Sequence, residues 1–179
     1  MTKYVRVMDG LKSNAGGFEY KLDEVNVATL WNPKETEPDK MGGFNFSTED
    51  KILRWLHRGD TIYDVIIPEG AEVIQVDEEK GLYRANKIIV TNPRPITDDM
   101  VMDIYKKSKL SNRVFAQSLK PLLWKNRLEI AKYAINDFVN KDNVDEIIDV
   151  YVNSATEHDY KTGDAFIIYN MLKDIQDKK

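Results

Sequence analysis

Four polar residues have side chains that could bind a phosphorylated small molecule: Arg6, Ser47, Thr48 and Asn86. The planar guanidinium of Arg6 suits two-point contact with a phosphate. The hydroxyl of Ser47 and the amide of Asn86 could position a sugar by hydrogen bonds. In a plainer interpretation, Ser47 only caps a helix and Arg6 is only a cation at a strand edge.

The four side chains must be positioned by residues 1–96, whose sequence patterns are mostly typical of β-strands. Alternating β-branched and aromatic residues predict strands at residues 4–8, 44–46, 61–67, 73–76 and 83–90, and more weakly at 18–20. Ser47, followed three residues later by Asp50, predicts the start of a helix whose apolar face contains Ile52 and Leu56. Pro68 and Gly70 predict a turn between two strands.

The pattern becomes helical after the Asn92–Pro95 boundary, where Thr97 is the expected N-cap. Apolar residues at three- and four-residue spacing between Trp124 and Phe138 predict the strongest helix. Residues 114–119 predict a short helix or turn before Pro121, and further helices follow at residues 144–151 and after Gly163. The inward-facing residues of this half are expected to be Trp124, Leu128, Ile135 and Phe138, packed on Ile147, Ile148 and the last helix.

The sequence therefore predicts an α+β protein with two parts. Residues 1–96 form a mixed β-sheet of roughly five strands with one helix, and residues 97–179 form a helical subdomain packed on it. Period-two alternation predicts that one apolar face of the sheet contains Val5, Val7, Val65, Ile67, Val73, Ile88 and Val90.

The order of these features resembles the ADP-ribosyltransferase fold. The matching features are Arg6 on the first strand, the run Phe46-Ser47-Thr48-Glu49, and a strand–Pro-x-Gly–strand connection at residues 62–74. The resemblance implies that the first-strand arginine binds a nicotinamide dinucleotide. It also implies a Ser-Thr-Ser-like triplet after a phenylalanine-rich strand. Just before a late strand, it implies a glutamate, and this glutamate directs the transfer reaction.

The expected glutamate is missing from this chain. Residues 83–87 are Tyr-Arg-Ala-Asn-Lys, and Asn86 cannot stabilise an oxocarbenium ion as a carboxylate would. Glu78 and Glu79 lie earlier in the chain, at a spacing that does not suit the role. We therefore expect no catalytic residues, no required cofactor, and NAD as the one candidate ligand.

Residues 42–90 also resemble an uncharacterised domain of phage and large-virus proteins. The shared pattern is Gly-Gly-aromatic-x-Phe-Ser/Thr, a helix, a strand with an acidic residue, a Pro-x-x-Ala turn, and a closing Tyr-Arg-Ala-Asn-Lys-Ile-Ile. This resemblance implies a viral or prophage origin but no assigned activity. In large viruses such domains often precede ankyrin-like helical repeats, which would suit the helices after Thr97.

Composition narrows the class of protein. The chain has 179 residues, 42% hydrophobic and 31% charged, which is typical of a globular protein with its own core. A net charge of −4 argues against nucleic-acid binding by the whole molecule. Cysteine is absent, which excludes disulfides, thiolate metal sites and a cysteine nucleophile. No signal-peptide pattern or membrane-length apolar run is found, so we expect a soluble cytoplasmic protein, in the host cytoplasm if viral, with its oligomeric state open.

A basic stretch between residues 106 and 132 is the second candidate surface. Eight lysines and arginines stand there against one acid, Glu129, and could meet a phosphate or an acidic partner protein. The residues assigned to partner binding are Lys106, Lys107, Lys109, Arg113 and Lys125. The alternative is a solvated helix face balanced by acids of the last helices.

No metal site is expected. The only histidines are His57 and His158, and His57 with Asp60 and Asp64 provides too few converging ligands.

Two functions are left open. One is a viral or prophage accessory protein that acts, without catalysis, as an interaction module on a host protein such as a defence factor. The alternative is an ADP-ribosyltransferase-like enzyme or an NAD-binding pseudoenzyme.

Overall fold

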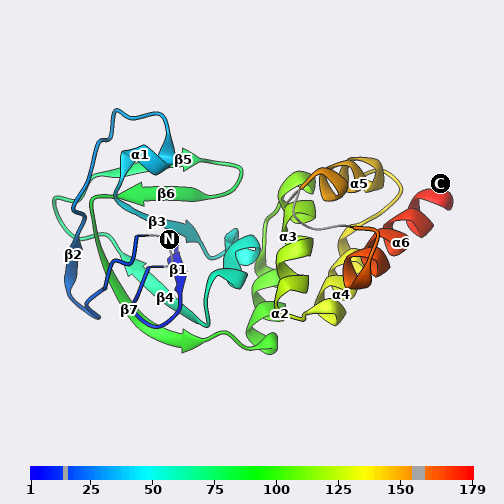
Figure 1. Cartoon of the computed structure of the whole chain (residues 1–179), viewed down its shortest axis with the longest axis horizontal. Helices are drawn as coiled ribbons and strands as arrows, with labels where there is room; N and C mark the ends of the chain where they lie inside the picture. Colours follow the sequence, from blue (N-terminus) through cyan, green and yellow to red (C-terminus); the bar gives the residue numbers. More distant parts are fainter. Residues whose placement is uncertain (14–15, 155–159) are drawn as a thin grey trace. The chain divides into compact units, whose positions relative to one another are not determined.

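The computed structural model describes residues 1–13, 16–154 and 160–179, so His158 lies outside the described residues. The fold is α+β, as the sequence predicts, with the sheet in the N-terminal half and helices in the C-terminal half (Figure 1). Contacts divide the chain into two compact units. The first comprises residues 1–52 and 58–96, and the second comprises residues 53–57 and 97–179. We call them the sheet unit and the helical unit.

The sheet unit contains seven strands in the order β2-β7-β4-β1-β3-β6-β5, and every neighbouring pair is antiparallel. The predictions of a mixed sheet and of roughly five strands were wrong, because all neighbouring strands run antiparallel and because β2 and the separation of β6 from β7 raise the number of strands. The strands are β1 Tyr4–Met8, β2 Val25–Val27, β3 Phe44–Thr48, β4 Thr61–Ile66, β5 Val73–Asp77, β6 Leu82–Ala85 and β7 Lys87–Pro95. Strands β2 and β5 form the two edges (Figure 1).

The single strand predicted at residues 83–90 is two strands, interrupted at Asn86. Strand β7 also continues through Pro93 to Pro95, beyond the predicted boundary, and Pro95 is opposite Thr61 of β4. Strand β2 pairs only with residues 87–89, so one side of β7 is open near its end. Proline is tolerated there because no neighbouring strand needs its missing N–H on the open side.

Both faces of the sheet bury apolar side chains. One face carries the principal core, formed by Met8, Tyr20, Phe44, Phe46, Tyr63, Val65, Ala85, Ile88 and Val90. Val5 and Val7 are also buried, but the register places Val5 opposite Asp64 and therefore on the other face from Val65. The predicted single apolar face was thus wrong for Val5 and Val7. It was also wrong for Val73, which is exposed on edge strand β5.

The helix predicted to start at Ser47 begins later. Ser47 and Thr48 are the last two residues of β3, and a 3-10 helix, η1, covers Ile52–Arg58 with Lys51 as its N-cap. The predicted cap at Ser47 was wrong because pairing with β1 continues through Thr48. One further short helix, α1, covers Pro38–Met41.

Five helices make up most of the helical unit: α2 Asp98–Lys107, α3 Asn112–Trp124, α4 Leu128–Phe138, α5 Val144–Asn153 and α6 Gly163–Asp177. The predicted cap at Thr97 is confirmed, since its hydroxyl accepts a hydrogen bond from the Met100 N–H at 3.2 Å. Ile135, Ile147 and Leu172 are fully buried in the core of this unit.

Trp124 does not face inward as predicted. It ends α3 and is 38% exposed, because a turn with Asn126 at φ 58° separates it from α4. Its three- and four-residue spacing to Leu128 therefore crosses a helix boundary. Pro121 lies inside α3, which is longer than predicted. A proline in a helix interior costs about 3 kcal/mol, and α3 offsets this by burying eight residues.

Candidate functional site

Arg6 projects from β1 at the point where β1 and β3 separate. Strand β1 pairs with β3 only through Tyr4 and Val5, whereas its pairing with β4 covers all five residues. The Arg6 guanidinium bridges the resulting gap. Its Nη1 donates to both the main-chain and the side-chain oxygen of Asn45, and its Nη2 donates to the Ser13 hydroxyl at 3.3 Å.

The charge of Arg6 is buried without a carboxylate partner. Only 8% of the residue is exposed, and its remaining described contact is the Tyr20 ring, whose centroid lies 5.1 Å from the guanidinium carbon. Burial lowers the pKa of Arg6, and the charge of Arg84 acts in the same direction, while Tyr20 opposes them. Sequence reasoning identified Arg6 but not the second arginine.

Arg84 of β6 lies opposite Asn45 of β3. Its Nη1 donates to the Gly42 carbonyl at 2.9 Å, and its Nη2 lies 3.7 Å from the carboxylate of fully exposed Asp39. Burial lowers the pKa of Arg84, and Asp39 opposes this effect. The residue opposite Arg84 therefore accepts the hydrogen bonds of Arg6, although strand alternation directs Arg6 and Arg84 to different faces of the sheet.

Ser47 and Thr48 point to opposite faces of the sheet, because neighbouring strand residues alternate. Thr48 is opposite Tyr4, on the face of Arg6, whereas Ser47 is opposite Val5, on the other face. Both residues are buried, and the Ser47 hydroxyl has no hydrogen-bond partner among the described residues. The two hydroxyls therefore cannot contact one small ligand from the same side of the sheet.

The amide of Asn86 is engaged in the backbone of the sheet. Its Oδ1 accepts a hydrogen bond from the Glu72 N–H at 2.8 Å, and its own N–H donates to the Glu72 carbonyl at 3.2 Å. The Asn86 carbonyl accepts a hydrogen bond from the Ala28 N–H at 2.9 Å. These contacts join three segments at the break between β6 and β7, so a structural role accounts for the asparagine at this position.

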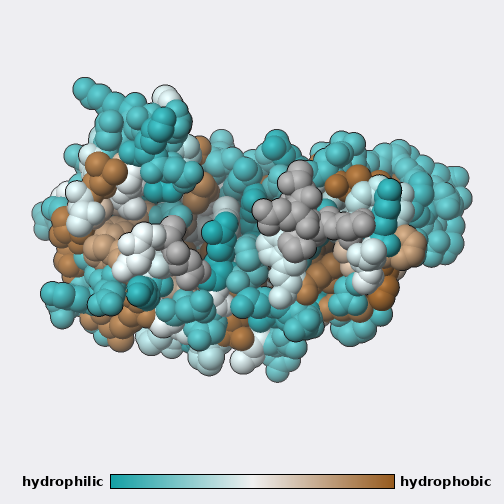
Figure 2. All heavy atoms as spheres, in the orientation of Figure 1, coloured by the Kyte–Doolittle hydropathy of each residue, from teal (hydrophilic) through white to brown (hydrophobic). Residues whose placement is uncertain are grey.

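An exposed apolar row crosses the β2 side of the sheet and was not found from the sequence. Ile66 of β4 and Val25 of β2 are both opposite Ile89 of β7, which places the three side chains in line on one face. Ile66 and Val25 are each 49% exposed, and Val27 beside them is 55% exposed. We call Ile66, Ile89, Val25 and Val27 the edge row. Figure 2 shows hydrophobic surface over this edge of the sheet among hydrophilic surroundings.

The residues assigned to partner binding in the basic stretch do not form one patch. Lys106, Lys107, Lys109 and Arg113 lie at the α2–α3 connection, whereas Lys125 follows the far end of the 13-residue helix α3. Such a helix is about 20 Å long.

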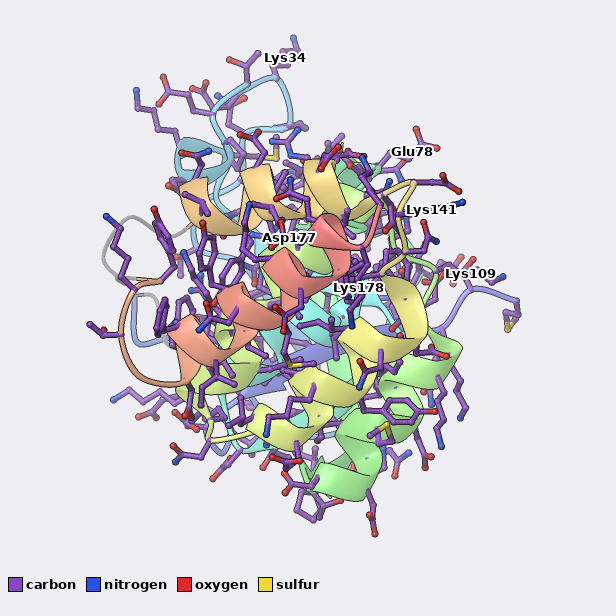
Figure 3. All side chains as sticks on the ribbon, turned by 90° about the vertical axis from the view of Figure 1, so that its right-hand side faces the viewer. Lys34, Glu78, Lys109, Lys141, Asp177 and Lys178 are labelled. Atoms are coloured by element: carbon purple, nitrogen blue, oxygen red, sulfur yellow. The ribbon has the colours of Figure 1, made fainter. Side chains whose placement is uncertain are left out.

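Acidic residues lie close to the larger group of cations. Asn112, next to Arg113, donates to the Glu146 carboxylate at 2.8 Å and accepts from Asn143 at 3.5 Å. This places the start of α5, with its acids, beside the α2–α3 connection. Lys109 and Lys141 are on the same flank of the helical unit in Figure 3, and Asp177 and Lys178 show the same mixture of charges at the C-terminal end of α6. The surface is therefore mixed in charge, which matches the alternative interpretation.

Lys120 belongs to the basic stretch in sequence but is buried in the helical unit. It is 2% exposed, its Nζ donates to the Ser154 carbonyl at 2.6 Å, and it lies 5.0 Å from the centroid of the Tyr151 ring. Burial lowers the pKa of Lys120. The ammonium group caps the C-terminal end of α5 and cannot contribute to a partner surface.

This burial predicts a pH dependence of stability. Between the lowered pKa and the ordinary value of 10.5, the unfolded chain binds more protons at Lys120 than the folded chain. The free energy of unfolding should therefore rise with pH below 10.5, and Lys120→Met should remove this rise. Urea unfolding from pH 7 to 10 measures it, with exposed Lys107→Met as the matched control. An identical slope in wild type and Lys120→Met would contradict the assignment.

Metal binding finds no support among the described residues, where no three His, Asp or Glu side chains gather in a way that could hold an ion. The Nδ1 of His57 lies 2.9 Å from the Arg54 carbonyl, and Asp64 accepts hydrogen bonds from Arg94 and Asn92. None of the described helices combines the length and apolar character that crossing a membrane requires.

Comparisons with protein-family models, with curated proteins and with solved structures find no match to this chain. The candidate site therefore rests on its own geometry. In that geometry Arg6 donates hydrogen bonds to Asn45, and the Asn86 amide is engaged in the backbone of the sheet. It also leaves the edge row exposed.

Proposed function

We propose that this protein is a non-catalytic interaction module that binds a partner protein through the edge row. In the setting that the viral resemblance implies, it is a viral or prophage accessory protein and the partner is a host factor, such as a defence protein. The observation that carries the proposal is the line of half-buried Ile89 between exposed Ile66 and Val25 at the edge of the sheet. Clustered exposed apolar side chains favour a protein-binding surface.

The backbone of β2 supports a partner that docks as an extended strand. The Ala28 N–H donates to Asn86 of the β6–β7 connection, and Asn26 is opposite Ile88. Because successive residues of a strand direct their peptide groups to alternate sides, Val25 and Val27 present their N–H and C=O groups away from β7. An open edge of this kind pairs with an added strand, whose main chain supplies affinity and whose alternate side chains supply specificity.

The occupant that fits is therefore an extended segment of a partner protein with apolar residues at alternate positions. Its main-chain groups would pair with those of Val25 and Val27, and its apolar side chains would cover the edge row. The exposed charges of Lys21 and Glu24, beside β2, would select polar residues at the ends of that segment.

Substitution of the edge row tests this function. A photo-crosslinking residue at position 25 identifies the partner, and its Kd is then measured for wild type, Val25→Asp and Val73→Asp. We expect Val25→Asp to weaken binding by about tenfold or more, as loss of a central apolar contact does. Val73 is the matched control, an exposed valine on the opposite edge strand. Equal binding by Val25→Asp, or loss of binding only in Val73→Asp, would contradict the proposal.

One observation favours the alternative, an ADP-ribosyltransferase-like enzyme or an NAD-binding pseudoenzyme. Arg6 is buried and has no carboxylate among its described partners, so no opposite charge balances it. Against turnover, the segment that would carry a catalytic glutamate contains Arg84 and Asn86, and the Asn86 amide is engaged with Glu72. The pseudoenzyme is therefore the form of the alternative that the contacts support better.

A further inference from the structure

Strand β5 is the second open edge of the sheet, and it is longer than β2. It covers Val73–Asp77 and pairs with β6 alone (Figure 1). Just before it, the Glu72 carbonyl accepts a hydrogen bond from the Asn86 N–H, which directs the Glu72 peptide groups toward β6. Because successive residues of a strand direct their peptide groups to alternate sides, Val73 and Gln75 present their N–H and C=O groups away from β6.

These outward groups of β5 have no main-chain partner among the described residues. No main-chain hydrogen bond or isolated bridge from another described segment reaches Val73 or Gln75. Both residues are exposed, Val73 to 36%. Each of them offers one donor and one acceptor to an incoming strand. The edge is therefore able to pair with an added strand, as open sheet edges do.

The charge on this edge is negative at both ends. Exposed Glu69 and Glu72 precede the strand, and exposed Glu78 follows it. Within residues 69–80 the acids are Glu69, Glu72, Asp77, Glu78 and Glu79, and the one cation is Lys80. Like charges placed opposite one another destabilise strand pairing, so these acids oppose pairing of β5 with a second copy of itself. They favour a strand that carries positive charge.

Neighbouring lysines balance only part of this charge. The Lys80 ammonium lies 3.6 Å from the Asp77 carboxylate. Lys51 donates to the main-chain carbonyls of Glu78 and Glu79, which fixes the turn after β5. Exposed charges at the rim of an interface act mainly on partner choice and on the rate of association. The acids would therefore select the partner, and the open main chain would supply its affinity.

We propose that β5 binds an extended basic segment of a second partner protein, with lysine or arginine at both ends of the segment. Its main chain would pair with Val73 and Gln75. A five-residue strand is about 17 Å long, so cations about five residues apart in the segment would lie beside Glu72 and Glu78. The site does not use the edge row, so it stands or fails separately from the proposed protein-binding function.

A titration of the isotope-labelled protein with a capped hexapeptide, Lys-Val-Thr-Val-Thr-Lys, tests the site by amide NMR. We expect chemical-shift changes centred on residues 73–77 and a Kd that weakens as salt is added, because exposed charges are screened. A peptide with glutamate in place of both lysines should not bind. Glu78→Lys should weaken the Kd by about three- to tenfold, as reversal of a rim charge does. Glu24→Lys is the matched control, since Glu24 is an exposed glutamate beside the opposite edge strand.

Val73→Pro is a second variant, which removes an outward N–H. Proline is tolerated at the first residue of an edge strand, and the loss of one main-chain hydrogen bond should weaken the Kd by about fivefold. Val25→Pro makes the same change at the first residue of β2 and should leave peptide binding unchanged. If Val73→Pro does not fold, Glu78→Lys decides. No shift changes at β5 in wild type, equal binding of the acidic peptide, or an unchanged Kd in Glu78→Lys would overturn the proposal.

Discussion

Phe115→Ala should destabilise the helical unit by about 3–5 kcal/mol, the usual cost of truncating a buried phenylalanine. Phe115 is 1% exposed, and its ring stacks on Phe138 with centroids 4.1 Å apart and an interplanar angle of 13°. The substitution would leave a cavity between α3 and α4 and remove this aromatic contact. Urea unfolding measures the loss. Phe166, 41% exposed on α6, provides the control Phe166→Ala, which should cost far less. Equal costs would contradict the described core.

Gly42→Ala should destabilise the sheet unit more than Gly70→Ala, although both glycines have φ of 74°. An added methyl group at Gly42 would lie 2.2 Å from the Leu30 carbonyl oxygen, whereas nothing lies within 4 Å at Gly70. Gly42 combines this φ with a ψ of −152°, a region that is essentially restricted to glycine and costs an L-residue about 1–3 kcal/mol. The clash should add about 1–3 kcal/mol, as overpacking does.

The pair Gly42→Ala and Gly70→Ala compares a crowded position with an open one at the same φ. The measurement is the difference in free energy of unfolding between the two variants. A difference near zero would mean that the segment carrying Leu30 can move away from Gly42. In that case the loop between β2 and β3 would not be fixed against the sheet as described.

The fold class was predictable because local signals agree with the final structure over most of the chain. The turn at Pro68 and Gly70 is confirmed, with Gly70 at positive φ and the Ala71 N–H donating to the Pro68 carbonyl. Thr97 marks the start of α2 as expected. The order of the strands could not be predicted from the sequence, because the alternation within a strand does not specify which other strand it pairs with.

Ser47 illustrates why local signals fail. A serine followed by acidic residues is typical of a helix start, yet tertiary pairing with β1 keeps Ser47 in a strand. The exposed apolar row was missed for a related reason. Ile66, Ile89 and Val25 are far apart in the sequence, and only the register of three strands brings them into line.

The candidate site was predictable only in part. Arg6 stood out by its residue type and place on the first strand, and its burial makes it a central feature of the sheet unit. Arg84 was overlooked because residues 83–87 were compared with a pattern that expects a carboxylate. Arg84 in that segment carries the opposite charge, and its place opposite Asn45 depends on the pairing of β3 with β6.

The central claim, a binding module without catalysis, is tested most directly by incubating the purified wild-type protein with NAD⁺. Nicotinamide release and the intact mass of the protein are followed together, with a protein-free sample as the control for spontaneous hydrolysis. We predict no nicotinamide release above that control and no added mass, because Asn86 occupies the position where the resemblance to ADP-ribosyltransferases would place a catalytic carboxylate, and its amide oxygen accepts a hydrogen bond from the Glu72 N–H. Sustained nicotinamide release, or a mass increase of one ADP-ribose group, would contradict the account.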